Sequence, residues 1–155
     1  MPTLETSGLD EFVLALDEIA EIPDSVMESM LNAAGDVLAE AQKKKGRAYG
    51  ICQREGGGKM LDSIKKRKPG RTADGGYIRV GFAGGRVRTH NKRKTKPATV
   101  SYASNAEIAF YNEYGLPGRG IPARPFIRDA NDESTGEAVK AAADIYYDWL
   151  ESKNL

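Results

Sequence analysis

The sequence predicts an α+β fold in which a small antiparallel β-sheet packs against an N-terminal helical hairpin and a long C-terminal helix. Apolar residues recur at helical spacing towards both ends of the chain, whereas the middle holds two short segments with the composition of strands. Because the helices flank the strands and do not alternate with them, an α+β layer is favoured over a doubly wound sheet. At 155 residues the chain is most simply one domain, residues 1–155.

Two amphipathic helices are predicted for the N-terminal hairpin. The first has an apolar stripe at three- and four-residue steps, formed by Leu9, Phe12, Val13, Leu16, Ile19 and Ala20. Pro23 interrupts this pattern, because proline is tolerated only in the first turn of a new helix. A second stripe follows, formed by Val26, Met30, Ala33, Val37 and Ala41. Lys43–Lys45 suit the negative end of this helix dipole, and Gly46 is expected to end the helix.

The middle of the chain is predicted to contain two basic loops and two strands. Residues from about 46 to 76 are basic and glycine-rich, so we expect a loop with a short helical turn at Lys59–Lys66. Tyr77–Phe82 has the composition of a strand, a second basic loop covers about 84–97, and Ala98–Tyr102 is the next strand. Loops of this length in a compact domain are commonly functional, or become ordered when a partner binds.

The C-terminal third is predicted to be mainly helical. Asn105–Gly115 has helical spacing, and Gly115–Ile121 is a turn or extended loop because it contains three glycines and a proline. The first of these helices has Ala106, Ala109 and Phe110 on one side. The last helix has apolar positions at Phe126, Ile127, Ala130, Ala138, Ala142, Ile145 and Trp149. We expect a break near Asp132–Gly136, where Ser134 and Glu137 have the spacing of a capping box.

Opposite charges are segregated along the chain, although its net charge is only +1. Residues 1–42 hold 10 acidic and no basic residues, and residues 43–96 hold 18 basic and 3 acidic residues. Residues 97–155 hold 5 basic and 9 acidic residues. Such asymmetry usually serves an interface with an oppositely charged partner. The candidates are nucleic acid, an acidic protein surface and the acidic face of a neighbouring copy.

No catalytic, metal or cofactor site is predicted. Cys52 and His90 are the only residues of their types, which excludes a disulfide within the chain and a structural zinc site. Gly56–Lys59 lacks the spacing of a phosphate-binding loop, and His90 has no identifiable Ser or Cys with an acidic partner. We therefore expect a protein that is not an enzyme and has no cofactor.

A membrane segment is not predicted either. No apolar run approaches the ~20 residues that a membrane helix needs. Met1–Gly8 lacks the basic and apolar regions of a signal peptide, so we expect a protein that stays in a cytoplasm.

The basic middle of the chain, residues 43–96, is a candidate nucleic-acid-binding module. Its candidate contacts to DNA or to a partner protein are Lys65, Lys66, Arg67, Lys68, Arg86, Arg88, Lys92, Arg93 and Lys94. Only Tyr49, Tyr77 and Phe82 are aromatic in this region, which supplies few platforms for base stacking. Solvated loops that complement acidic patches on a neighbour are an equally good interpretation of the same residues.

Residues 105–130 contain a motif that resembles a family of proteins from long-tailed bacteriophages. The motif consists of Glu113-Tyr114-Gly115, a short loop, and then Ala123-Arg124-Pro125-Phe126 at the start of the last helix. It is similar to the motif of the tail-component family, which includes head–tail joining and tail-completion proteins. Gly58–Ile64 and Tyr77–Phe82 resemble two upstream segments of that family, so the similarity runs in order along most of the chain.

The resemblance implies a structural virion protein that forms a ring, with a hexamer as in similar proteins, at the head–tail joint or tail terminus. It implies contacts with neighbouring connector and tail proteins, possible contact with passing DNA, and assembly in the cytoplasm of a bacterial host. Within the motif, Gly115 suits the positive φ that ends a helix, Arg124 is a candidate bidentate partner of Glu113, and Pro125 and Phe126 suit the first turn and the core. The motif residues either maintain the fold or contact a neighbouring subunit.

Overall fold

A computed structural model describes residues 22–51, 57–72, 75–90 and 99–153 of the chain. Its helices are α2 (Asp24–Ala48), α3 (Gly57–Asp62), α4 (Asn105–Tyr114), the short 3-10 helix η2 (Pro117–Arg119) and α5 (Phe126–Ser152). Its strands are β1 (Ile64–Lys66), β2 (Gly70–Thr72), β3 (Gly75–Tyr77), β4 (Val80–Phe82), β5 (Gly85–His90) and β6 (Thr99–Ser104). Long helices with small antiparallel sheets confirm the predicted α+β class. The first helix of the predicted hairpin lies outside the described residues.

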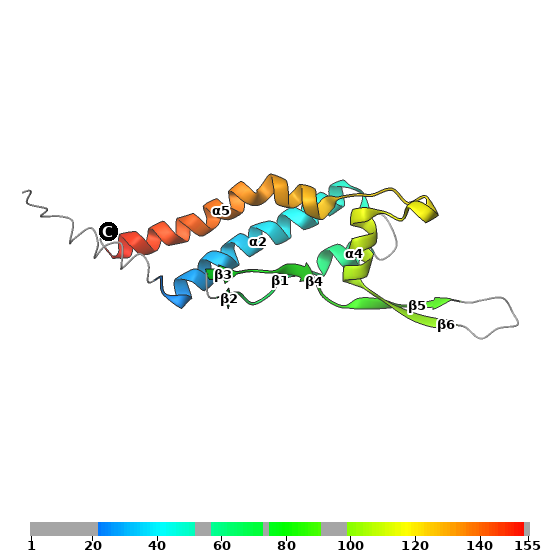
Figure 1. Cartoon of the computed structure of the whole chain (residues 1–155), viewed down its shortest axis with the longest axis horizontal. Coiled ribbons are helices and arrows are strands. Elements are labelled where there is room, and N and C mark those ends of the chain that lie inside the picture. The colour runs from blue at the N-terminus through cyan, green and yellow to red at the C-terminus, as the bar shows by residue number, and fades with distance from the viewer. Residues whose placement is uncertain (1–21, 52–56, 73–74, 91–98, 154–155) are drawn as a thin grey trace, which may run out of the picture.

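The two long helices, α2 and α5, run antiparallel and side by side along the length of the molecule (Figure 1). Small or polar residues occupy most of the buried positions of both helices and let their backbones approach closely. In α2 these positions are Gly35, Ala39, Gln42 and Gly46. In α5 they are Phe126, Ala130, Ser134 and Ala138. The amide of the buried Gln42 donates to Asn131 Oδ1 at 2.9 Å, which satisfies this polar group between the helices.

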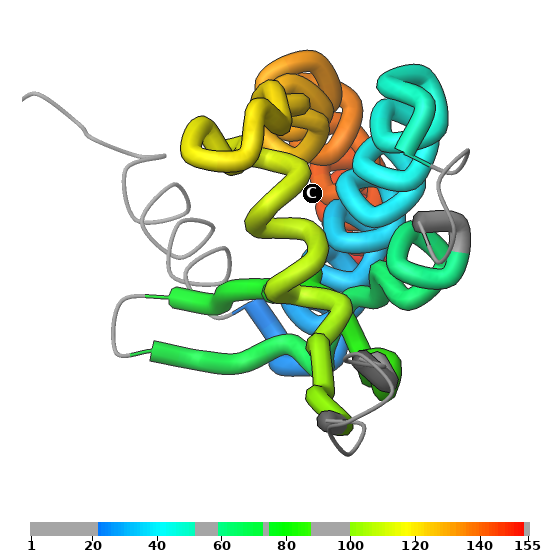
Figure 2. The backbone as a smooth tube through the Cα atoms, turned by 90° about the vertical axis from the view of Figure 1, so that its right-hand side faces the viewer, coloured from blue at the N-terminus to red at the C-terminus, as the bar shows by residue number. Residues whose placement is uncertain are grey.

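A long antiparallel ribbon, residues 64–82, lies under α2, and Figure 2 shows this strand layer beneath the two helices. Lys66 pairs with Val80 and Gly70 pairs with Tyr77, so three residues of the first arm face two of the second. This extra residue is a β-bulge, and it falls beside Pro69, which has no N–H to donate to the ladder. The ribbon fits closely against α2 because Gly35 carries no side chain: a Cβ there would lie 2.8 Å from Ile78 Cγ1.

The hydrophobic core lies where α2, α3, the ribbon, α4 and the start of α5 meet. Its largest fully buried side chains are Phe126, Ile51, Met60, Leu61 and Ile64. Ala39, Ala103, Ile108 and Ala109 complete it, and Phe82 packs edge-on against Phe126 with the ring centroids 6.4 Å apart. Beyond this core the β5–β6 hairpin projects from one end of the molecule (Figure 1).

The predicted loop at about 46–76 is wrong where residues 64–72 form one arm of the ribbon. The short helical turn predicted at Lys59–Lys66 is present as α3, although it starts and ends earlier, at Gly57 and Asp62. Weak periodicity and glycine content suggested a loop, but Met60, Leu61 and Ile64 are all fully buried. Tyr77–Phe82 is extended as predicted, although it is divided into β3 and β4 at the bulge. Part of the predicted loop at 84–97 is also ordered, since β5 runs to His90, and the predicted strand at Ala98–Tyr102 is confirmed as β6.

Two predicted helix boundaries are also wrong. Helix α2 does not end at Gly46 but continues to Ala48, because Gly46 is buried against α3 and serves packing rather than termination. Helix α5 has no break near Asp132–Gly136. The Ser134 hydroxyl donates to the Ala130 carbonyl at 2.6 Å within the continuous helix, so it caps nothing.

Gly46 and Gly136 give opposite predictions for the same substitution. A Cβ at Gly46 would lie 2.3 Å from Leu61 Cδ2, so we expect Gly46→Ala to destabilise the protein by about 1–3 kcal/mol through overpacking. Gly136 has nothing within 4 Å, so Gly136→Ala is expected to stabilise α5 by about 0.5–1 kcal/mol. Chemical denaturation of both variants measures the two changes. Equal effects of the same sign would show that Gly46 does not form the close contact.

Candidate interaction surfaces

The buried carboxylate of Glu113 joins helix α4 to the start of helix α5. Its Oε2 accepts a hydrogen bond from the Ile127 amide at 2.9 Å, and its Oε1 accepts one from the Arg128 amide at 3.0 Å. The first amides of a helix have no partner within the helix and carry partial positive charge. Glu113 therefore caps α5 from another element, and this contact fixes the angle between the two helices.

Gly115 ends helix α4 and starts the loop that leads to α5. Its φ is 73° and its ψ is −177°, as expected for a glycine at this position. A Cβ at Gly115 would lie 2.7 Å from both Ala123 N and Ile121 O, so the loop closes tightly on it. The loop is held by an isolated bridge between Leu116 and Ile121, and by the Arg124 amide, which donates to the Asn112 carbonyl at 2.7 Å.

The other motif residues differ in what they do. Arg124 and Glu113 both lie in the described part of the chain and form no ion pair with each other, so the predicted pairing is wrong. The Glu113 carboxylate instead accepts hydrogen bonds from the amides at the start of α5. Phe126 is fully buried and Pro125 stands at the N-cap of α5, both consistent with a structural role. Ala123 and Tyr114 are exposed. The motif thus combines residues that maintain the fold with at least one large side chain on the surface.

An exposed aromatic cluster lies on α4 beside this junction. Phe110 is 56% exposed and Tyr114 is 65% exposed, with their ring centroids 4.8 Å apart. The sequence predicted Ala106, Ala109 and Phe110 on one side, and of these only Ala109 is buried, together with Ile108 and Glu113. A groove of about 500 Å³ runs between α4 and α5 at this point, lined by both rings, Phe82 and Ile127. Large apolar side chains left exposed around a groove are typical of protein–protein contact sites.

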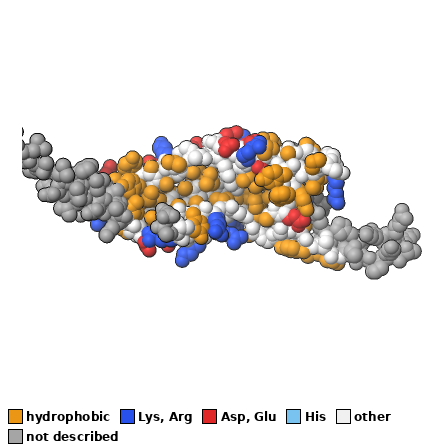
Figure 3. Space-filling model, viewed as in Figure 1, with side chains coloured by type: hydrophobic (Ala, Val, Ile, Leu, Met, Phe, Trp, Pro, Cys, Tyr) orange, Lys and Arg blue, Asp and Glu red, His pale blue; other side chains and the backbone are white. Residues whose placement is uncertain are grey.

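The ribbon carries four of the predicted basic contacts, and they divide into two kinds. Lys66 forms an ion pair with Asp36 of α2, and the neighbouring Arg71 forms one with Asp24. Lys65, Arg67 and Lys68 are exposed and make no ion pair within the described part of the chain. Figure 3 shows Lys and Arg side chains gathered over the ribbon. The charge segregation of the sequence is therefore partly compensated inside the molecule, between the ribbon and α2.

Two of the other predicted basic contacts lie on the β5–β6 hairpin. Arg86 is half-buried on β5, and Arg88 lies on the same strand. Lys92, Arg93 and Lys94 lie outside the described residues. The hairpin also exposes Val87, Val100 and Tyr102, which the sequence did not predict as contacts. Val87 on β5 and the alternation of Val100 and Tyr102 on β6 are the sequence signals that mark one face of the hairpin.

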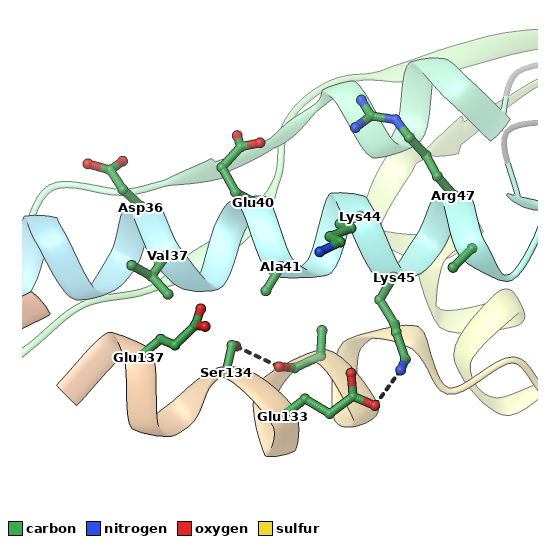
Figure 4. A pocket seen from close by; sticks show the side chains of 12 residues that line it. Asp36, Val37, Glu40, Ala41, Lys44, Lys45, Arg47, Glu133, Ser134 and Glu137 are labelled. Carbon is green, nitrogen blue, oxygen red and sulfur yellow. Dashed lines mark hydrogen bonds and ion pairs between the residues drawn. The ribbon is translucent and has the colours of Figure 1, made fainter. Parts of the chain in front are cut away.

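A second groove, of about 950 Å³, runs between α2 and α5 (Figure 4). Val37 and Ala41 form part of its apolar wall, and Glu133 and Glu137 line it from the other helix. Lys45 reaches across and forms an ion pair with Glu133 (Figure 4), and this hydrogen bond raises the pKa of the Lys45 ammonium group. Because the charged ends of Lys45 and Glu133 are exposed, this groove is open to solvent.

The phenol of Tyr49 donates a hydrogen bond to the Asp129 carboxylate close to the groove between α2 and α5. This hydrogen bond lowers the pKa of Asp129 below 3.8 and raises the pKa of Tyr49 above 10.0. A carboxyl group whose pKa is lower in the folded state than in the unfolded state stabilises the fold at pH values above its unfolded-state pKa. That contribution is lost as the pH falls through its folded-state pKa. For Tyr49 the contribution is present below pH 10.0 and is lost as the pH rises further.

A pH series tests this contact. We expect wild type to melt at a higher temperature than Tyr49→Phe at neutral pH, and the two melting temperatures to converge as the pH falls from about 4 to about 2. Tyr147→Phe, on the exposed side of α5, is the matched control and should melt like wild type throughout. A wild-type advantage over Tyr49→Phe that stays constant down to the lowest pH would contradict the assignment.

The described residues contain no group of three or more His, Cys, Asp or Glu side chains placed to hold a metal ion. Among the helices that the structure describes, none has the length and apolar character to cross a membrane.

Comparison with known proteins identifies one family. The model of the HK97-gp10-like family, described as "Bacteriophage HK97-gp10, putative tail-component", matches residues 10–115. This match includes the ribbon, the β5–β6 hairpin and α4, and it ends at Gly115, the first residue of the loop that leads to α5. No curated protein and no solved structure matches the chain.

Proposed function

The chain belongs to the HK97-gp10-like family of bacteriophage tail components, and from this we propose that it is a structural subunit of a ring at the head–tail joint or tail terminus. In this role it acts in head–tail joining or tail completion and performs no catalysis. The ring is a homo-oligomer, hexameric as the resemblance implies, and it contacts the adjoining connector and tail proteins. Assembly takes place in the bacterial cytoplasm, and the product is part of the virion.

The observation that carries this proposal is the amount of apolar surface exposed on two separate elements. Phe110 and Tyr114 flank a groove on α4, and Val87, Val100 and Tyr102 are each more than 60% exposed on the β5–β6 hairpin. A protein that works alone rarely exposes several large apolar side chains in groups. A ring subunit needs at least two contact surfaces, because each subunit touches two neighbours.

Native mass spectrometry of the full chain tests ring formation. We expect a species with a mass that is a whole multiple of 16.8 kDa, present alone or after addition of the neighbouring tail protein. Electron microscopy of the same sample should show closed rings. Monomers as the only species, both alone and with the neighbouring protein, would count decisively against this function.

A basic nucleic-acid-binding module is the second candidate, favoured by one observation. Lys65, Arg67 and Lys68 lie close together on one ribbon arm, exposed and without an ion pair in the part of the chain that is described. In a ring, such side chains either line the channel for passing DNA or meet acidic surfaces of the adjoining ring. Residues 43–96 would then supply phosphate contacts without base stacking.

A salt titration separates these two roles. If the ribbon binds DNA, affinity falls steeply with salt, with a slope of roughly −0.9 for each phosphate neutralised. Changing Lys65, Arg67 and Lys68 together to Gln should then flatten the slope. The matched control changes three exposed basic residues elsewhere, Arg119, Lys140 and Lys153, to Gln. Absence of DNA binding at ~50 mM salt eliminates the nucleic-acid role and leaves the acidic protein surface.

A further inference from the structure

One face of the β5–β6 hairpin is apolar and open to solvent. Val87 pairs directly with Tyr102, and Val100 lies two residues before Tyr102 on β6, so these three side chains share a face. Val87 is 66% exposed, Val100 is 68% exposed and Tyr102 is 64% exposed. The opposite face points towards the body, since Ala103, the partner of Arg86, is buried. The open face is available to another chain.

The charge of the hairpin segment indicates what kind of segment binds it. Residues 84–104 contain six basic residues and no acidic residue. Residues 1–22 contain six acidic residues and no basic residue. Within that acidic stretch, residues 9–20 carry the apolar stripe of a predicted amphipathic helix, although this segment lies outside the described residues. An acidic segment with an apolar stripe complements a basic segment of the chain that presents an apolar face.

The length of the molecule decides which copy supplies the segment. The hairpin and the start of α2 lie at opposite ends of the molecule (Figure 1). Helix α2 has 25 residues and is therefore about 37 Å long, whereas a helix over residues 9–20 is about 18 Å long. Only residues 21–23 separate that segment from α2, so as a helix it cannot reach the hairpin of its own chain.

We propose that the acidic segment 9–20 of one copy binds the Val87–Val100–Tyr102 face of the next copy, which joins subunits head to tail. This inference rests on the proposed ring and names its interface. A heterologous contact of this kind forms a closed ring when the rotation between neighbours closes, whereas a two-fold contact of identical patches would stop at a dimer. The docking face is confined to the described strands Gly85–His90 and Thr99–Ser104.

Substitutions on each side of the interface give the first test. Val100→Glu with Tyr102→Glu alters the hairpin, and Leu16→Lys alters the segment. We expect each to raise the subunit concentration at half-assembly by about tenfold or more, measured by sedimentation velocity. Val139→Glu is the matched control, because Val139 is also apolar and 62% exposed but lies on α5. Circular dichroism melts verify that all variants fold, and Val100, Tyr102 and Val139 are all exposed.

Cross-linking between two different chains gives the second test. In a Cys52→Ser background, one chain carries Leu16→Cys and the other carries Val100→Cys. After mixing and mild oxidation we expect a disulfide-linked dimer of the two different chains as the main product. Adding Tyr102→Glu to the second chain should reduce that product.

The outcomes separate this inference from the proposed function. If wild type assembles and the hairpin variant assembles equally well, the head-to-tail contact is overturned and the ring remains. The same holds if wild type assembles but no mixed cross-link forms. In a chain that carries both cysteines, cross-linking within the single chain instead would show that residues 9–20 pack on their own subunit, which also overturns it. Failure of wild type to assemble in any sample removes the ring itself.

Discussion

Replacing Phe126 by alanine is expected to destabilise the subunit by about 3–5 kcal/mol, because the substitution leaves a cavity in the core. Phe126 is 0% exposed, packs against Phe82 and lies in the first turn of α5, where α4, the ribbon and α2 meet. Small domains have a total stability of roughly 5–15 kcal/mol, so the substitution would remove a large share of the free energy of unfolding. Urea denaturation measures the change directly.

Phe110→Ala is the matched control for this prediction. It removes the same side chain from a helix, but Phe110 is 56% exposed and its ring packs against Tyr111 and Tyr114. We expect a change in stability of less than about 1 kcal/mol from this exposed position. The same substitution should weaken assembly if the α4 cluster contacts a neighbour. A larger loss of stability for Phe110→Ala than for Phe126→Ala would contradict the core described above.

Gly115→Ala is expected to have the second largest effect. Its φ of 73° with ψ of −177° lies in a region that only glycine populates, and forcing another residue there costs roughly 1–3 kcal/mol. The added Cβ would also lie 2.7 Å from Ile121 O and from Ala123 N, which are backbone atoms that cannot turn away. The loop must shift, and this shift disturbs the Glu113 contact with the first amides of α5. Thermal unfolding should show a clear decrease in melting temperature.

Gly118→Ala controls for the loss of glycine in the same loop. A Cβ added at Gly118 would have nothing within 4 Å, and the residue belongs to the short helix η2, so the change should be close to neutral. If Gly115→Ala and Gly118→Ala melt together, the conformation of Gly115 is not required, and the motif glycine has another role.

Elements that depend on local spacing were predicted well from the sequence. The helix behind Pro23, the strand before Asn105 and the helix that follows it are all present. The buried positions of α2 are Gly35, Ala39, Gln42 and Gly46, however, and not the predicted apolar stripe. Gly115 and Phe126 have the predicted conformation and burial. In each case the signal lies within a few residues of the position it describes, so tertiary contacts did not need to be known.

The first arm of the ribbon could not be predicted, because its stability comes from contacts with a distant helix. Residues 64–72 are rich in lysine and arginine, so their composition alone does not indicate a strand. They are held by docking onto α2, where Gly35 permits close approach and Lys66 meets Asp36. Contacts with α2 could not be predicted from the charge segregation either. It therefore suggested an external partner for basic residues, some of which form ion pairs with acidic residues of the same chain.

Glu113 shows a similar limit at the candidate site. Its spacing from Arg124 suggested an ion pair, but the carboxylate binds the amides at the start of α5, which lack partners within their own helix. Helix α4 is therefore rotated so that Glu113 faces inwards, and Phe110 is left on the surface. The aromatic cluster is exposed because the Glu113 carboxylate on the same helix is buried. A pattern of hydrophobic residues could not indicate that a carboxylate would be buried.

Quantitative mass spectrometry of purified particles, from a phage that encodes this chain, tests its role as a structural tail component most directly. We expect the chain to be present in the particles at the copy number of a single ring, in a fixed ratio to the major tail protein. Complete, infective particles that contain no copy of the chain would contradict a structural role.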